Sequence, residues 1–130
     1  MTIQTLIASV IITILPYWST IPNSDLTCDE VGGVWINSQI YICEDWDESF
    51  SLSHELAHEY YQIHMTTTDK EKYLKLYLGA KKQWLRAFYR DYSMGDVEED
   101  FCDNFAVWRT WEKRNILVEK RIKFIKRLFN

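Results

Sequence analysis

The amino-acid sequence predicts a single α+β domain in which a small sheet or hairpin packs on several helices. Two short segments before residue 44 are rich in β-branched and aromatic residues and are separated by turn residues, which is typical of strands. After residue 47, apolar residues recur every three or four positions, which indicates helices. The chain has 130 residues, of which 47% are hydrophobic, so it has enough apolar side chains for one core and little room for a second.

The first 24 residues form an apolar segment without a charged side chain. Its stretch 6–15 has the length of a signal-peptide core and, extended to Trp18, of a membrane anchor, which predicts an exported or membrane-anchored protein. No Lys or Arg precedes the stretch, however, and its Ile, Val and Thr residues equally suit a buried strand of a cytoplasmic protein. We therefore divide the chain into this segment, 1–24, and a domain over 25–130, and leave cleavage between them open.

A β-hairpin is predicted just before the helical part of the chain. Its strands are residues 32–36 and 39–42, with Asn37 and Ser38 at the turn. Cys28 and Cys43 flank the hairpin, either as a disulfide or as two reduced cysteines that pack like small apolar side chains. Cys28 lies beyond the residue that would face Cys43 in a simple hairpin, so neither alternative is favoured.

The next segment carries an HExxH motif, His54-Glu55-Leu56-Ala57-His58. On a helix, residues four apart project from the same side, so both imidazoles can bind one Zn²⁺ ion while Glu55 stands beside it. Residues 47–53 supply several possible N-caps, and an apolar helical pattern continues through the motif. Zinc lowers the pKa of water that it binds to about 7, and a neighbouring carboxylate can take the proton. The motif predicts a zinc metalloendopeptidase with Glu55 as general base.

Two histidines are not enough, because catalytic zinc usually takes three protein ligands and leaves one position open. His64 stands ten residues after His54, as in the metzincin motif HExxHxxGxxH, but Tyr61 occupies the glycine position. An uninterrupted helix would also turn His64 about 120° away from His58. His64 is therefore the less favoured third ligand.

The favoured third ligand is Glu99, at the start of a later predicted helix. Asp103 lies one turn further on and can accept a hydrogen bond from the far nitrogen of a zinc-bound histidine. The competing interpretation is a capping box, with Asp96 as N-cap and Glu99 at the third position. Glu98 replaces Glu99 as the ligand if the helix is shifted by one residue, and Cys102 is expected to be buried packing.

An HExxH motif followed by a helix that reads ExxxD, with Phe-Ala just beyond it, resembles a minimal gluzincin, and most of all the ImmA/IrrE-type metallopeptidases. The resemblance covers roughly residues 33–112. It implies a zincin-like fold, a zinc site completed by Glu99, and Asp103 in the place of the family's second conserved polar residue. It also implies that the strand before the HExxH helix has an open edge that pairs with the substrate peptide. The residues of that strand here are Ile40, Tyr41 and Ile42. The N-terminal segment and the cysteines depart from the family, so its intracellular regulatory role is not carried over.

A long helix is predicted after the HExxH helix, from a capping box of Thr68 and Glu71 to about Tyr89. Its apolar residues recur at helical spacing and are expected in the core. They are Tyr73, Leu76, Tyr77, Ala80, Trp84 and Phe88.

The last segment, 116–129, predicts a basic amphipathic helix. Residues 113–130 hold seven Lys or Arg and one Glu, whereas residues 1–112 hold eight basic and eighteen acidic residues. Such a helix either packs its apolar stripe on the domain or lies on an anionic membrane surface. Nucleic acid is not an expected partner, because the acidic body opposes phosphate and no recognition motif is present.

Two further hypotheses stand beside a peptidase that acts on peptides or proteins. The first is a catalytically inactive zincin-like interaction domain, which binds zinc but only holds a partner at a membrane or protein surface. The second is an accidental HExxH motif, which predicts that zinc does not bind in stoichiometric amount. Substrate specificity, oligomeric state and biological role are not predicted by the sequence.

Overall fold

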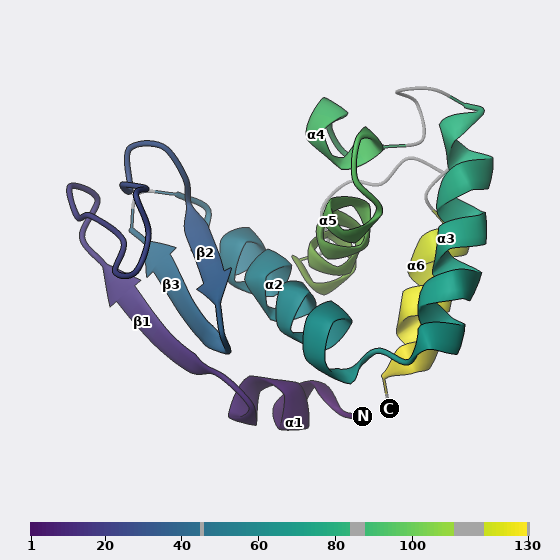
Figure 1. The fold of residues 1–130 in the computed structure, drawn as a ribbon, viewed down its shortest axis with the longest axis horizontal. Coiled ribbons are helices and arrows are strands. Elements are labelled where there is room, and N and C mark those ends of the chain that lie inside the picture. The colour runs from purple at the N-terminus through teal and green to yellow at the C-terminus, as the bar shows by residue number, and fades with distance from the viewer. Residues whose placement is uncertain (45, 84–87, 111–118, 130) are drawn as a thin grey trace.

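The computed structural model describes residues 1–44, 46–83, 88–110 and 119–129, and its fold is α+β, as predicted (Figure 1). A three-stranded sheet lies on one side, α2 runs beside it, and the remaining long helices pack beyond α2 (Figure 1). In chain order the elements are α1 (Ile3–Ala8), β1 (Ile11–Leu15), β2 (Gly33–Ile36), β3 (Gln39–Cys43), α2 (Glu48–Glu59), the π-helical η1 (Tyr60–His64), α3 (Thr67–Lys81), α4 (Asp91–Met94), α5 (Val97–Thr110) and α6 (Glu119–Leu128).

The predicted hairpin is confirmed as β2 and β3, which pair antiparallel with Val34 opposite Tyr41. Asn37 and Ser38 connect the strands with positive φ angles of 48° and 64°. Two consecutive residues in this region form the turn whose twist matches that of the flanking strands.

The predicted open edge at Ile40, Tyr41 and Ile42 is wrong, because β3 is the central strand in the order β1-β3-β2. β1 pairs parallel with β3 and covers the edge that β2 leaves free, with Ile12 opposite Ile40. The main-chain groups of β3 are therefore used on both sides. The strand next to α2 that keeps one side unpaired in the sheet is β2.

The apolar N-terminal segment thus contributes a strand to the sheet. Leu6 of α1 is fully buried in the main core, whereas Ile11 and Ile14 of β1 are 66% and 53% exposed. β1 is an edge strand with one partner and is not the fully buried strand that its composition suggested. Within the described residues, none of the helices combines the length and apolar character needed to cross a bilayer.

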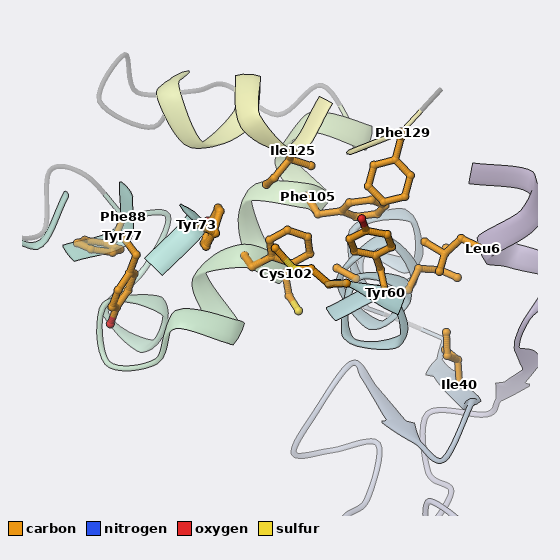
Figure 2. Packing of buried hydrophobic residues seen from close by; sticks show 14 of the residues in the cluster. Leu6, Ile40, Tyr60, Tyr73, Tyr77, Phe88, Cys102, Phe105, Ile125 and Phe129 are labelled. Carbon is orange, nitrogen blue, oxygen red and sulfur yellow. The ribbon is translucent and has the colours of Figure 1, made fainter. Parts of the chain in front are cut away.

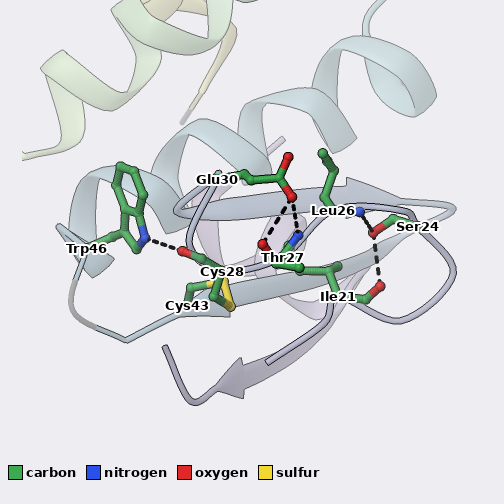
Figure 3. The surroundings of a disulfide bond; sticks show 8 residues. All are labelled: Ile21, Ser24, Leu26, Thr27, Cys28, Glu30, Cys43 and Trp46. Atoms are coloured by element: carbon green, nitrogen blue, oxygen red, sulfur yellow. Dashed lines mark hydrogen bonds between the residues drawn. A yellow bond between two sulfur atoms is a disulfide. The ribbon is translucent and has the colours of Figure 1, made fainter. Parts of the chain in front are cut away.

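Cys28 and Cys43 are bridged, which resolves the alternative that the sequence left open (Figure 3). Their Cα atoms are 5.5 Å apart. Cys28 reaches Cys43 because the segment before β2 folds back on the sheet: the Cys28 amide donates to the Ser19 carbonyl, and the Trp46 indole donates to the Cys28 carbonyl over 2.8 Å. The bridge lies in a small apolar cluster with Ile21 and Tyr41.

The main core lies among α2, α3, α5 and α6 and is rich in aromatic rings (Figure 2). Of the apolar face predicted for α3, Tyr73, Tyr77 and Phe88 are buried, while Leu76 and Ala80 are half-buried. Trp84 lies outside the described residues. The predicted bounds of this helix are wrong: the N-cap is Thr66, which accepts from the Asp69 amide, and α3 ends at Lys81.

The C-terminal helix packs its apolar stripe on the domain, with Ile122 and Ile125 buried in α6. The first residues of the predicted helix, 116–118, lie outside the described part of the chain. Arg121 is also buried, and its Nη1 donates to Asp100 Oδ1 over 2.6 Å. Tyr73 donates its hydroxyl to the other oxygen of Asp100, so one buried carboxylate joins α3, α5 and α6. Removing one partner of such a buried ion pair strongly destabilises a protein, because the other charge is left buried without a partner.

Candidate metal centre

The HExxH motif lies on α2, which begins where Asp47 accepts a hydrogen bond from the Phe50 amide over 3.1 Å. α2 packs along α5, which carries the predicted third ligand (Figure 1). α5 begins after Asp96, whose Oδ1 accepts from the amides of Glu98 and Glu99. The capping role of Asp96 is therefore confirmed. The Glu99 amide donates to Asp96, while the Glu99 carboxylate contacts the histidines. The helix cap and the metal-ligand interpretation are therefore compatible.

Glu99 lies between the two imidazoles. Its Oε2 is 3.0 Å from Nε2 of His54, and its Oε1 is 3.2 Å from Nε2 of His58. These three side chains are mostly buried. The structure thus brings together the three residues that the sequence favoured as ligands.

The outer nitrogen of each imidazole faces a further carboxylate. His54 Nδ1 is 2.8 Å from Asp103 Oδ1, which places Asp103 where the sequence predicted it. His58 Nδ1 is 2.6 Å from Glu98 Oε2. Glu98 therefore serves the outer side of His58 and does not replace Glu99 on the inner side.

Each outer carboxylate is itself held in place. Arg90 donates to both oxygens of Asp103, over 2.8 and 2.9 Å, which fixes the position of this carboxylate. Gln62 donates to both oxygens of Glu98 over 2.8 and 3.0 Å. Ionised carboxylates only accept hydrogen bonds, so the proton of each histidine is drawn to its Nδ1. Sequence reasoning missed Gln62 and Arg90. Gln62 stands four residues after His58, a spacing that could have been noticed, whereas Arg90 carries no sequence signal.

With protons on both Nδ1 atoms, the Nε2 lone pairs are directed at the Glu99 carboxylate, which also presents lone pairs. Glu99 Oε2 is buried without a hydrogen-bond partner although His54 Nε2 lies 3.0 Å away. This arrangement requires a positive charge between the three groups. The residues present therefore fit a divalent cation, bound by two imidazole nitrogens and one carboxylate.

The titration behaviour of the three groups has the same origin. Burial lowers the pKa of His54, but the close carboxylates of Asp103 and Glu99 outweigh the effect of burial and raise the pKa to about 9. Burial also lowers the pKa of His58, but its contacts with Cys102, Glu98 and Glu99 outweigh the effect of burial and raise the pKa. The two histidines hold the pKa of Glu99 well below its usual range despite burial. Without a metal, protons supply the positive charge that the site needs.

Cys102, on α5, is a second candidate for the third donor. It is buried, and its sulfur and one nitrogen from each of His54 and His58 lie within 4.8 Å of one another, so these three residues could bind a metal ion. Cys102 was expected only to pack in the core, and it does lie in the core cluster (Figure 2). Burial raises the pKa of its thiol, whereas Glu99 is held ionised. A metal ligand must be deprotonated, so Glu99 is the better prepared donor.

The alternative ligand His64 is not at this site. It ends η1, with Nε2 3.3 Å from Glu59 Oε2 and 3.4 Å from Ser9 Oγ. Glu59 is buried and also accepts from the Trp35 indole over 2.9 Å. This cluster joins α1, β2 and α2, and His64 is placed there because the chain continues as a π-helical turn after Glu59.

Glu55 lines a cleft of about 710 Å³ together with His54, His58 and Glu99. The side chain is 7% exposed, and burial raises the pKa of its carboxyl. Residues 33–35 of β2 also line the cleft. A Cβ atom at Gly33 would lie 3.3 Å from Glu55 Cγ and 3.0 Å from Ile42 Cδ1, so glycine allows β2 to approach the HExxH helix closely.

Comparisons of the chain with protein-family models, curated proteins and solved structures give no match.

Proposed function

We propose that the protein is a zinc-dependent metallopeptidase of the zincin-like type, in which His54, His58 and Glu99 bind the ion. The observation that supports this most strongly is the paired orientation of the imidazoles. Each has its Nδ1 against a carboxylate and its Nε2 against Glu99. Zinc sites in proteins typically have ligating histidines oriented in this way by outer carboxylates.

A bound Zn²⁺ ion would polarise the scissile carbonyl and make water a stronger acid. Glu55 takes a proton from the attacking water and later donates it to the leaving amine. Burial raises the pKa of Glu55, which makes its carboxylate a better proton acceptor than an exposed glutamate. Asp103 and Glu98 hold the imidazoles in one tautomer and one orientation throughout.

The substrate strand in this proposal is β2. An extended peptide can add to a free strand edge through main-chain hydrogen bonds. β2 is an edge strand, and its residues 33–35 line the cleft that contains Glu55. A peptide lying along β2 would therefore pass over the candidate metal centre.

The test separates metal binding from hydrolysis. Glu55→Gln is expected to bind one zinc ion per chain and to lose peptide cleavage, whereas Glu99→Ala is expected to lose zinc. Cys102→Ala, on the same helix as Glu99, is the matched control and is expected to keep both zinc and activity. Zinc content is measured by mass spectrometry, and cleavage of a peptide library is measured with and without a chelator. Peptidase activity retained in Glu55→Gln would reject the mechanism, and zinc lost in Cys102→Ala but kept in Glu99→Ala would reject the ligand set.

The same experiment distinguishes the inactive interaction domain. If the wild-type protein binds zinc in a one-to-one ratio but shows no chelator-sensitive cleavage, the metal supports a binding surface and not a peptidase. The disulfide between Cys28 and Cys43 also supports an oxidising compartment, and with it an exported or membrane-anchored protein, because such bonds persist mainly outside the cytosol.

A further inference from the structure

A second hollow of about 920 Å³ lies between α3 and α6, which run side by side on the far side of the molecule from the sheet (Figure 1). Its rim carries five cationic side chains, and we call it the basic groove. They are Lys72 and Lys75 from α3 and Lys120, Lys123 and Arg127 from α6. All five are exposed, and Asp69 is the acidic residue among the lining residues.

No described residue neutralises these cations through an ion pair. Like charges this close repel one another, so an anion placed between them would be bound favourably. The rest of the chain has the opposite charge, since outside these five cations it carries ten Lys or Arg residues and nineteen Asp or Glu residues. The groove therefore brings five cations together in a chain that is otherwise acidic.

The packing of α6 on the domain determines which of its side chains are exposed in the groove. Its apolar stripe is used internally, with Ile122 and Ile125 buried, and Arg121 is fixed by the buried bond to Asp100. α6 therefore does not have a free apolar face to insert into a bilayer. Its basic side faces outward on a helix that is firmly attached.

The floor of the groove is apolar and only partly covered. Leu76 of α3 and Phe124 and Leu128 of α6 line it and are half-buried. The exposed cationic rim, which projects beyond this floor, is suited to the phosphate layer of an anionic phospholipid surface. Four of the five cations are lysines, which act as point charges and do not provide the bidentate fork of arginine. The groove also lacks, among its described lining residues, the row of exposed aromatic rings on which unpaired bases stack.

We propose that the basic groove docks the protein on an anionic phospholipid bilayer. Lipid phosphates contact the five cations. This docking does not depend on the metal centre, which lies between α2 and α5. Attraction is expected to be electrostatic and to fall with added salt, because the screening length shrinks from about 10 Å at 0.1 M to about 3 Å at 1 M.

The test measures co-sedimentation of the full chain with vesicles. Binding is expected to vesicles of phosphatidylserine mixed with phosphatidylcholine, and not to phosphatidylcholine alone. Each basic residue near an anionic surface contributes a factor of roughly five in partition, so Lys75→Glu with Lys123→Glu is expected to weaken binding at least about 25-fold. The matched control is Lys82→Glu with Arg109→Glu, which changes the net charge equally outside the groove and is expected to retain most of the binding.

Three results would overturn the proposal: no binding to anionic vesicles at low salt, equal loss in the groove and control variants, or binding of a duplex oligonucleotide through the groove without vesicle binding. Thermal unfolding checks that each variant is folded. If the charge-reversed groove variant is not folded, Lys75→Gln with Lys123→Gln removes the same two cations more mildly and is expected to weaken binding about 25-fold.

Discussion

Replacing Glu98 by glutamine tests the least expected part of the candidate metal centre. Glu98 accepts from His58 Nδ1 over 2.6 Å, on the side of the ring away from Glu99. Gln62 donates to both of its oxygens. In Glu98→Gln one of these oxygens becomes an amide NH₂ group, so a donor faces either Gln62 or His58. The variant therefore either loses the hydrogen bond that orients His58 or keeps a weaker, uncharged one.

The expected effect is on zinc affinity and only slightly on folding. Loss of an outer partner of a metal-bound histidine typically weakens metal binding 10- to 100-fold, or about 1.4–2.7 kcal/mol. Glu98 is partly exposed, and its side chain at 19% exposure is screened by water, so the stability of the zinc-free fold should change by less than about 1 kcal/mol. Asp103→Asn would be a less clear test, because Asp103 is fully buried and also pairs with Arg90.

The assay is a zinc titration in competition with a chelator of known affinity, with thermal unfolding of the zinc-free protein measured in parallel. Glu71→Gln makes the same chemical change on the exposed surface of α3 and serves as control. A dissociation constant that changes less than threefold, within about 0.7 kcal/mol, would refute the orienting role of Glu98. A loss as complete as that in Glu99→Ala would show instead that Glu98 is itself a ligand.

Two further predictions concern stability. In the zinc-free protein, the pKa of His54 is raised from 6.5 to about 9, so the stabilisation from its protonated form is complete below pH 6.5 and is lost as the pH rises through 9. Urea unfolding of the zinc-free protein should show this loss, of up to roughly 3 kcal/mol. Zinc affinity should rise over the same pH range, because Zn²⁺ displaces the proton from His54. A free energy of unfolding that does not change between pH 6.5 and 9 would contradict the raised pKa of His54. Replacing Cys28 and Cys43 together by alanine opens a loop of sequence separation 15 and should lower the free energy of unfolding by about 3 kcal/mol; a change below about 1 kcal/mol would contradict a stabilising bridge.

The parts of the site that the sequence predicted are those fixed by local helical geometry. His54 and His58 are four residues apart, as are Glu99 and Asp103, and a helix places each pair on one face whatever the rest of the fold does. Asp47 and Asp96 are recognisable N-caps and fix where these two helices begin. Only one non-local assumption was needed, namely that the two helices face each other.

The errors arose where pairing between distant segments decides the structure. β1 and β3 are more than twenty residues apart, and their parallel pairing leaves no local sequence signal. The hairpin of β2 and β3 was predictable from its turn, but which of its two edges stays open depended on β1. The disulfide was undecided for the same reason, because Cys28 reaches Cys43 only through the fold of the preceding loop.

The roles of Glu98 and Glu99 follow from the cap once both helices are placed. With Asp96 capping α5, Glu98 and Glu99 are consecutive in its first turn and project about 100° apart. Two adjacent carboxylates can therefore reach the two nitrogens of one imidazole, and His58 lies between them. If Glu98 only stabilised the N-terminus of α5, it would need no partner on α2, but its carboxylate contacts His58 of that helix. Gln62, one turn beyond His58, donates to both oxygens of Glu98. Glu98, Glu99 and Gln62 therefore act together to orient His58.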